Sequence, residues 1–382
     1  MKIIVAPDSF KESLDAVGVA QAIQGGIRSV LPDSDVILLP IADGGEGTVN
    51  ALVTAGGGQF EKTLVSGPLG DPVLATWGIL SDNTAVIEMA AASGLPLAPV
   101  DRRNPLLTSS MGTGQLISAA LDRGCQRIVL GLGGSATNDG GAGVLAALGA
   151  KLLDDGGKEI SATAQGLLDL DSIDISCFDP RLASVQVDIA CDVTNPLLGP
   201  RGASRTYGPQ KGADENMVEI LEQALGRLAE VARCGHGKDI ATFHGSGAAG
   251  GLAAGLSLVA RTNLRPGIEL VLETVDFTRH LQGAGLAFTA EGRIDAQSAM
   301  GKAISGVAQL CRRAKVPVIA LCGTLGRDYQ EVYKEGVTAV LPILDAPMSL
   351  EEAFEQAPRL LSAAAARAMR IILGCQGRGH DI

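Results

Sequence analysis

The chain has 382 residues, with 31 Lys and Arg against 42 Asp and Glu, so its formal net charge is −11 at pH 7. This acidic balance argues against nucleic acid and anionic membranes as partners. Hydrophobic residues make up 46% of the chain but aromatic residues only 3%, so the core must consist mainly of aliphatic side chains. The length is typical of two or three domains.

Cysteine usage and the first residues indicate a soluble, cytoplasmic protein. The seven cysteines include no CxxC pair, and together with the four histidines they show no metal-ligand spacing. We therefore expect reduced, packed thiols. The apolar run of residues 1–5 is too short for a signal peptide, and no stretch is long enough to span a membrane.

Short apolar runs alternate with helical patterns along the chain. In chain order, the predicted strands are residues 3–5, 36–39, 127–130, 185–190, 286–289 and 316–321. The predicted helices are residues 15–31, 48–55, 114–123, 141–152, 216–233 and 301–315. This alternation indicates α/β layers with parallel sheets, in which ligands bind at the carboxyl ends of the strands.

Two changes of composition indicate domain boundaries. Residues 61–73 include TLVSGPLGDPV, which is typical of a hairpin or a linker, and a second break lies at residues 265–267. We expect a central domain, residues 71–279, inserted into a discontinuous domain formed by residues 1–70 and 280–382.

The loops after the first two predicted strands carry acids, a hydroxyl group and a lysine. The first loop reads APDSFKES and presents Asp8, Ser9 and Lys11. Such a turn can bind a substrate or a phosphate at a helix N-terminus, or it can be an ordinary N-cap with a solvated lysine. The second loop reads ADGGEGT, in which Asp43 can orient a hydroxyl group or belong to a plain turn.

The glycine-rich sequence GLGGSATNDGGAG, residues 131–143, follows an apolar run that is typical of a buried strand. Glycine lets backbone N–H groups approach an anion closely, because it has no side chain and tolerates positive φ. The sequence therefore predicts a phosphate-binding loop, with a flexible connector as the alternative.

The motif CDVTNPLLG places Asp192 just after the predicted strand 185–190, with Asn195 one turn further on. A carboxylate at a strand end is costly unless it is needed or paired, so Asp192 is a candidate general base or magnesium ligand. The next motif, YGPQKGA, carries Lys211. This lysine can neutralise a transferring phosphoryl group, or it can be an exposed loop residue.

The motif EGRIDAQSAMGK combines Glu291 and Asp295 with Arg293. Two carboxylates beside cations suit a metal–phosphate centre, and a salt-bridged helix start is the alternative. The sequence GSGAAGG, residues 245–251, matches the dinucleotide-binding pattern but has no predicted strand before it. The residues alone thus indicate an α/β enzyme that handles a phosphorylated ligand.

These seven motifs, taken in the order in which they occur along the chain, resemble the bacterial glycerate kinase type 1 family from Lys2 to about Val340. The resemblance implies a magnesium-dependent kinase that transfers phosphate from ATP to D-glycerate, with 2-phosphoglycerate as the usual product. It also implies an α/β fold of two domains, in which a Rossmann- or flavodoxin-like parallel-sheet domain, here residues 71–279, is interleaved with a second α/β domain. The active site is expected in the cleft between them. His244, Ser246 and Ala290 depart from the family pattern, and these departures affect only the local shape of two loops.

The resemblance also suggests a role for each candidate residue. Asp192 is expected to act as the base, and Lys11 and Arg293 to pair with the glycerate carboxylate or the γ-phosphate. The expected substrate-binding residues are Asp8, Ser9, Asp43 and Asn195. The expected nucleotide- and phosphate-binding residues are Gly133, Gly134, Ser135, Thr137, Asn138 and Lys211. The expected magnesium ligands are Glu291 and Asp295.

The sequence leaves several alternatives open. The enzyme can phosphorylate the 3-hydroxyl group instead, or act on a related small hydroxy acid. A binding protein that has lost catalysis would bind nucleotide without turnover, and a dinucleotide-dependent oxidoreductase would bind NAD(P)H. Whether the chain is a monomer or a homodimer is also left open.

Overall fold

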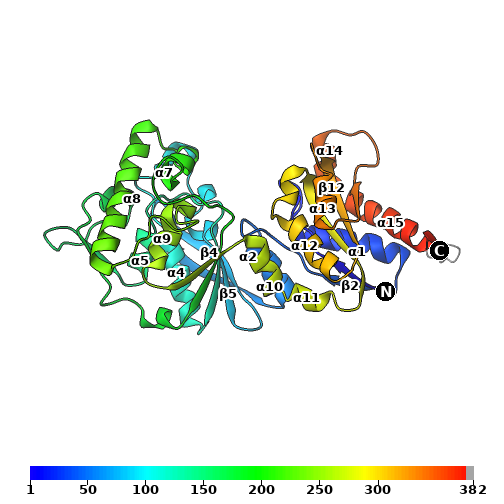
Figure 1. Cartoon of the computed structure of the whole chain (residues 1–382), viewed down its shortest axis with the longest axis horizontal. Coiled ribbons are helices and arrows are strands. Elements are labelled where there is room, and N and C mark those ends of the chain that lie inside the picture. Colours follow the sequence, from blue (N-terminus) through cyan, green and yellow to red (C-terminus); the bar gives the residue numbers. More distant parts are fainter. Residues whose placement is uncertain (376–382) are drawn as a thin grey trace. The chain divides into compact units, whose positions relative to one another are not determined.

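The computed structural model describes residues 1–375 and divides into two compact units, each built of helices around a sheet (Figure 1). The terminal unit contains residues 1–43, 50–57 and the chain from residue 268 onward, and the central unit contains residues 44–49 and 58–267. The helix α2 (Thr48–Gly56) begins in the central unit and continues in the terminal unit.

These boundaries differ from the expected ones on both sides. Residues 58–70 belong to the central unit, because β3 (Gln59–Ser66) pairs along its whole length with β4 (Pro72–Ile79). Residues 268–279 belong to the terminal unit, where Gly306 lies against the side chains of Ile268 and Leu272.

The terminal unit has a five-stranded, fully parallel sheet in the order β13-β12-β11-β1-β2. Its strands are β1 (Lys2–Val5), β2 (Asp35–Leu38), β11 (Ala284–Ile294), β12 (Val318–Leu325) and β13 (Ala339–Pro342). Its other helices are α1 (Ala16–Val30), α10 (Gly267–Thr274), α11 (Phe277–His280), α12 (Ala303–Arg313), α13 (Glu331–Glu335), α14 (Leu350–Glu355) and α15 (Ala357–Cys375). In chain order within this unit the strands read 2-1-3-4-5, which is the flavodoxin-like order.

The helix α1 illustrates how the sequence forms this unit. Asp15 caps it by accepting a hydrogen bond from Gly18 N, and the buried residues Val19, Ile23 and Ile27 recur at a spacing of four. This apolar stripe packs against α15, and Figure 1 shows the two helices side by side near the C-terminal end of the described chain. Gly26 allows the close approach, because a Cβ atom there would clash with the backbone of Ser362.

The central unit has a six-stranded mixed sheet in the order β10-β9-β6-β5-β4-β3, together with the antiparallel pair β7-β8. The strands β5, β6, β9 and β10 are parallel, and the hairpin of β3 and β4 is antiparallel. The further strands are β5 (Thr84–Glu88), β6 (Arg127–Gly131), β7 (Lys151–Leu153), β8 (Ser172–Asp174), β9 (Gln186–Ala190) and β10 (Arg261–Arg265). The helices are α3 (Ala90–Ser93), α4 (Met111–Asp122), α5 (Ala142–Ala147), α6 (Ala164–Leu167), α7 (Ala203–Tyr207), α8 (Glu215–His236) and α9 (Leu252–Ser257).

Three expectations about the central unit can now be compared with the structure. A Rossmann- or flavodoxin-like domain was expected at residues 71–279; the flavodoxin-like strand order lies in the terminal unit, whereas the central sheet has four parallel strands and an antiparallel hairpin at one edge. The hairpin expected at residues 61–73 is confirmed, with its turn closed from Gly67 N to Asp71 O at 2.7 Å. The helix expected over residues 141–152 ends at Ala147, because Gly149 has a φ of +97° and the chain continues as β7.

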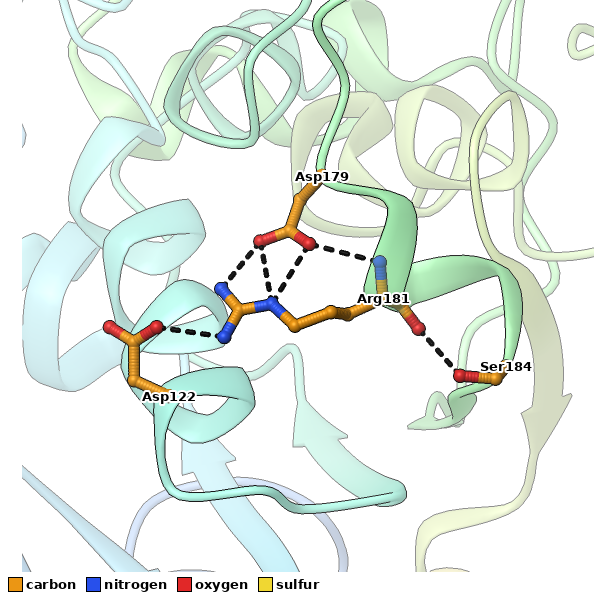
Figure 2. Close-up of polar contacts among 4 residues, drawn as sticks. All are labelled: Asp122, Asp179, Arg181 and Ser184. Atoms are coloured by element: carbon orange, nitrogen blue, oxygen red, sulfur yellow. Dashed lines mark hydrogen bonds and ion pairs between the residues drawn. The ribbon is translucent and has the colours of Figure 1, made fainter.

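A polar network fixes the short 3-10 helix Pro180–Ala183 to α4 (Figure 2). The guanidinium group of Arg181 donates to both carboxylate oxygens of Asp179 and to Asp122 of α4. Asp179 also caps this helix by accepting from the backbone N–H of Arg181. The arginine is largely exposed, so this network orients the segment and adds little to stability.

The core of both units is aliphatic, as composition predicted, and Trp77 is buried in the central one. All seven cysteines are free thiols. Among the helices of residues 1–375, none is long and apolar enough to cross a membrane.

Candidate active site

In the terminal unit, β1 and β11 are neighbours at the centre of the sheet, and the chain leaves them toward opposite edges. In a flavodoxin-like sheet this is the topological switch point, where ligands bind outside the carboxyl ends of the strands. The strand ends are joined by a hydrogen bond from Asp8 N to Ala290 O at 2.9 Å. The loop after β2 runs beside them, since Ile41 N donates to Pro7 O at 3.0 Å.

This switch point brings together four of the predicted residues. Asp8, Lys11 and Asp43 interact electrostatically, and Glu291 interacts with Asp8. The backbone N–H of Ser9 donates to Asp8 Oδ1 at 2.6 Å. The first two strand loops and the end of β11 thus form one polar site.

The two partly buried carboxyl groups at this site have raised pKa values. Burial raises the pKa of Asp8 to about 6, the charge of Asp43 adds to the effect, and the hydrogen bond from Ser9 opposes it. Burial likewise raises the pKa of Glu291 to about 7, against the hydroxyl group of Ser298, which donates at 3.0 Å. Neighbouring carboxyl groups that titrate near neutral pH are typical of sites that bind cations or move protons.

The segment after Glu291 is a capped 3-10 helix, Ala296–Ala299. Asp295 accepts from Gln297 N at 2.9 Å and forms an ion pair with Arg293 Nε at 3.2 Å. The salt-bridged helix start, left open by the sequence, is therefore present. It does not exclude ligand binding by Arg293, whose side chain is 63% exposed.

In the central unit, the glycine loop 131–143 follows β6. Two of its glycines are explained by close contact with the loop at residues 44–45. A Cβ atom on Gly131 would lie 2.6 Å from Gly44 O, and one on Gly133 would lie 2.8 Å from Gly45 Cα. Gly134 is exposed and has a φ of +71°, so the turn Gly133–Ser135 is the part of this loop nearest to solvent.

The side chains of Thr137, Asn138 and Lys211 lie in the interior, and their expected contacts with phosphate groups stay predictions. Lys211 is 2% exposed and donates from Nζ to Thr137 O at 2.6 Å. Asn138 donates to Ser204 Oγ at 3.1 Å. Thr137, Asn138 and Lys211 are thus buried beneath the loop, Ser135 is 8% exposed, and Gly134 is exposed to solvent.

Asp192 is exposed directly after β9, where its Oδ1 accepts from Gly267 N at 2.8 Å. Asn195 is engaged on both sides of its amide. Its Nδ2 donates to Arg201 O at 2.7 Å, and its Oδ1 accepts from Tyr207 Oη at 2.8 Å. Asn195 thus fixes the loop that carries Asp192, and the expected contact with glycerate stays a prediction.

Two residues near these loops were missed from the sequence. Glu88 ends β5 and accepts from Val49 N at 2.7 Å, which caps α2, and burial raises the pKa of this carboxyl group. Asp139 is fully buried within the glycine motif. Its position beside Asn138 was visible, but the partners that bury it come from distant segments.

The sequence 245–251 does not follow a strand: the chain from Gly237 to Gly247 forms none, and a 3-10 helix, Ala248–Gly251, comes next. A dinucleotide fingerprint needs a strand before it and a long helix after it. The geometry therefore disfavours the oxidoreductase alternative.

Each unit is an α/β fold with polar loops at the carboxyl ends of parallel strands, which is where ligands bind in sheets of this kind. The chain belongs to the glycerate kinase family, whose sequence model matches residues 3–373. It is 51% identical over 358 residues to the glycerate kinase of Bacillus subtilis (strain 168), covering 94% of each chain. It is 49% identical to the glycerate 2-kinase of Escherichia coli (strain K12), again covering 94% of each.

A solved structure agrees with this assignment. The crystal structure of a Salmonella typhimurium LT2 protein, proposed to be glycerate kinase 2, matches with a TM-score of 0.90 and 45% sequence identity. The match covers 98% of this chain and 99% of that one.

Proposed function

We propose that this protein transfers the γ-phosphoryl group of ATP to the 2-hydroxyl group of D-glycerate, giving 2-phosphoglycerate and ADP. The observation that carries the proposal is the 49% identity, along nearly the whole of both chains, to a protein named glycerate 2-kinase. The strand-end loops support it independently, because phosphoryl transfer needs positioned charges and a proton acceptor more than covalent chemistry.

The terminal unit is proposed to bind the acid substrate and the transferred phosphate. Lys11 and Arg293 are exposed cations near the switch point, and such cations pair well with a carboxylate or a γ-phosphate. Asp8, Ser9 and Asp43 offer hydrogen-bonding groups for the hydroxyl groups of glycerate.

The chemistry of the donor set in this unit fits magnesium, which prefers carboxylate oxygens and is usually held by one or two of them plus substrate phosphates. Glu291 and Asp295 are the proposed ligands, and when bound the ion neutralises charge on the phosphates. Within residues 1–375, no three His, Cys, Asp or Glu side chains gather in a group that could hold a metal ion by itself.

The central unit is proposed to supply the base and the nucleotide-binding turn. Asp192 is a carboxylate held at a strand end by Gly267 N–H, and it is proposed to accept the proton of the 2-hydroxyl group. The turn Gly133–Ser135 is proposed to hold phosphate groups through its backbone. We place the enzyme in the cytoplasm, where its seven free thiols stay reduced.

Substrate scope tests this proposal. ADP release is measured with ATP and magnesium in the presence of D-glycerate, L-glycerate, glycolate or D-lactate. The proposal predicts rapid release with D-glycerate alone. Equal or faster release with another hydroxy acid contradicts the substrate assignment, and no release with any acid contradicts the kinase assignment.

A further inference from the structure

A buried network lies beneath the glycine loop and centres on Asp139. This residue is fully buried, and its carboxylate accepts four hydrogen bonds. Oδ2 accepts from Ser110 N at 2.8 Å, from Ser110 Oγ at 2.7 Å and from Gly143 N at 3.1 Å, and Oδ1 accepts from Gly141 N at 3.2 Å. One side chain thus fixes the end of the loop to the first residues of α5 and to the residue that precedes α4.

Lys211 lies on the other side of this network. It is buried, its ammonium group donates to Thr137 O at 2.6 Å, and it interacts electrostatically with Asp139. A buried cation is stable only beside a negative charge and hydrogen-bond acceptors. Lys211 therefore ties the 3-10 helix Pro209–Lys211 to the loop, and the charge of Asp139 opposes the lowering of the Lys211 pKa by burial.

The loop residues between these anchors are not fully satisfied. Thr137 Oγ1 and Asn138 Oδ1 are buried without a hydrogen-bond partner. Unpaired buried polar atoms are unfavourable, and they persist where the surrounding structure enforces a conformation that function requires. Asp139 and Lys211 are the groups that enforce it here.

We propose that Asp139 and Lys211 are positioning residues that hold the turn Gly133–Ser135 in the conformation that binds the phosphate groups of the nucleotide. The turn has no side chains long enough to fix itself, because two of its three residues are glycines. Leu95 N donates to Gly134 O at 2.9 Å on one side of the turn, and the anchored residues that follow the turn fix its other side. This inference rests on the proposed kinase function.

The test compares phosphate binding with binding of the rest of the nucleotide. In Asp139→Asn, the affinity for ATP with magnesium, measured by calorimetry, should fall by about tenfold or more. The KM for ATP should rise by a similar factor. Affinity for adenosine, which lacks phosphates, and the KM for D-glycerate should stay the same. Lys211→Met should behave likewise. The fold-loss of ATP affinity in the double variant should be smaller than the product of the two fold-losses in the single variants, because neither buried charge then remains without the other.

A largely buried ion pair in the central sheet provides the control. Asp188 is fully buried and pairs with Arg127 at 2.7 Å, and Arg127 is the first residue of β6, at the end opposite the glycine loop. Asp188→Asn should lower stability and leave the KM for ATP unchanged. If Asp139→Asn does not fold, Ser110→Ala, which removes one donor without changing charge, should still weaken ATP binding about threefold.

Two results overturn this inference alone: folded variants of the pair that bind ATP normally, or an equal loss of ATP binding in Asp188→Asn. A wild-type protein that neither binds nor uses ATP overturns the proposed function together with this inference. The two failures are therefore distinguishable.

Discussion

Replacing Glu291 by Gln should stabilise the ligand-free protein at neutral pH while it impairs catalysis. Burial raises the pKa of this carboxyl group from its usual 4.5 to about 7, so the folded state favours the protonated form. Below pH 4.5 the carboxyl group is protonated in both states and carries no penalty. As pH rises through 7, the free energy of unfolding decreases by the amount that corresponds to the rise in pKa. Gln resembles the protonated form at every pH and avoids this loss.

The size of the effect follows from the shift. One pKa unit corresponds to about 1.4 kcal/mol, so a rise from 4.5 to about 7 costs at most about 3 kcal/mol above pH 7. Solvent reaches part of the side chain and reduces this value. The stabilisation by Glu291→Gln should therefore increase by about 2 kcal/mol between pH 5 and pH 8.

Urea unfolding at pH 5 and pH 8, without magnesium or substrate, measures this difference. Glu352→Gln is the control, because Glu352 is exposed and the backbone N–H of Ser349 lowers the pKa of its carboxyl group. That variant should shift stability in the opposite direction at neutral pH. If Glu291→Gln has the same effect at both pH values, or destabilises at pH 8, the assigned electrostatics of the switch point are wrong.

The remaining predictions concern single residues in the two units. Asp192→Asn should lower kcat by about 100-fold or more with little change in the KM for D-glycerate, as expected for a lost base; a large rise in KM at normal kcat would assign it to binding instead. Arg293→Ala should raise the KM for D-glycerate or ATP without lowering the melting temperature, since the side chain is 63% exposed; unchanged kinetics would remove it from the site. Gly131→Ala should destabilise the protein by about 1–3 kcal/mol, because its Cβ would lie 2.6 Å from Gly44 O, and an unchanged melting temperature would contradict this packing.

Most of the fold could be predicted because its strands are strong local signals. All six predicted strands are present, including β1, β6 and β9, since each contains a short run rich in apolar, mostly β-branched residues. The strands β5, β7, β8, β10 and β13 were not predicted. Of these, β10 reads RTNLR, and it becomes a strand only because β9 is available to pair with it along its whole length.

The candidate site was predictable as a set of loops but not as a set of side-chain environments. Asp8 and Glu291 were singled out because polar residues follow short strands, and the parallel sheet brings them together. Lys211 was expected at a phosphate, yet it is buried, because its partners Thr137 and Asp139 are more than 70 residues away in sequence. Local sequence carries no sign of such a partner, and the same reason explains why Glu88 was missed.

The position of phosphorylation tests the central claim most directly. The purified protein is incubated with ATP, magnesium and D-glycerate, and the product is identified by phosphorus NMR against both phosphoglycerate standards. The account predicts the signal of 2-phosphoglycerate with an equal amount of ADP. A signal of 3-phosphoglycerate, or ADP without any phosphoglycerate, would contradict it.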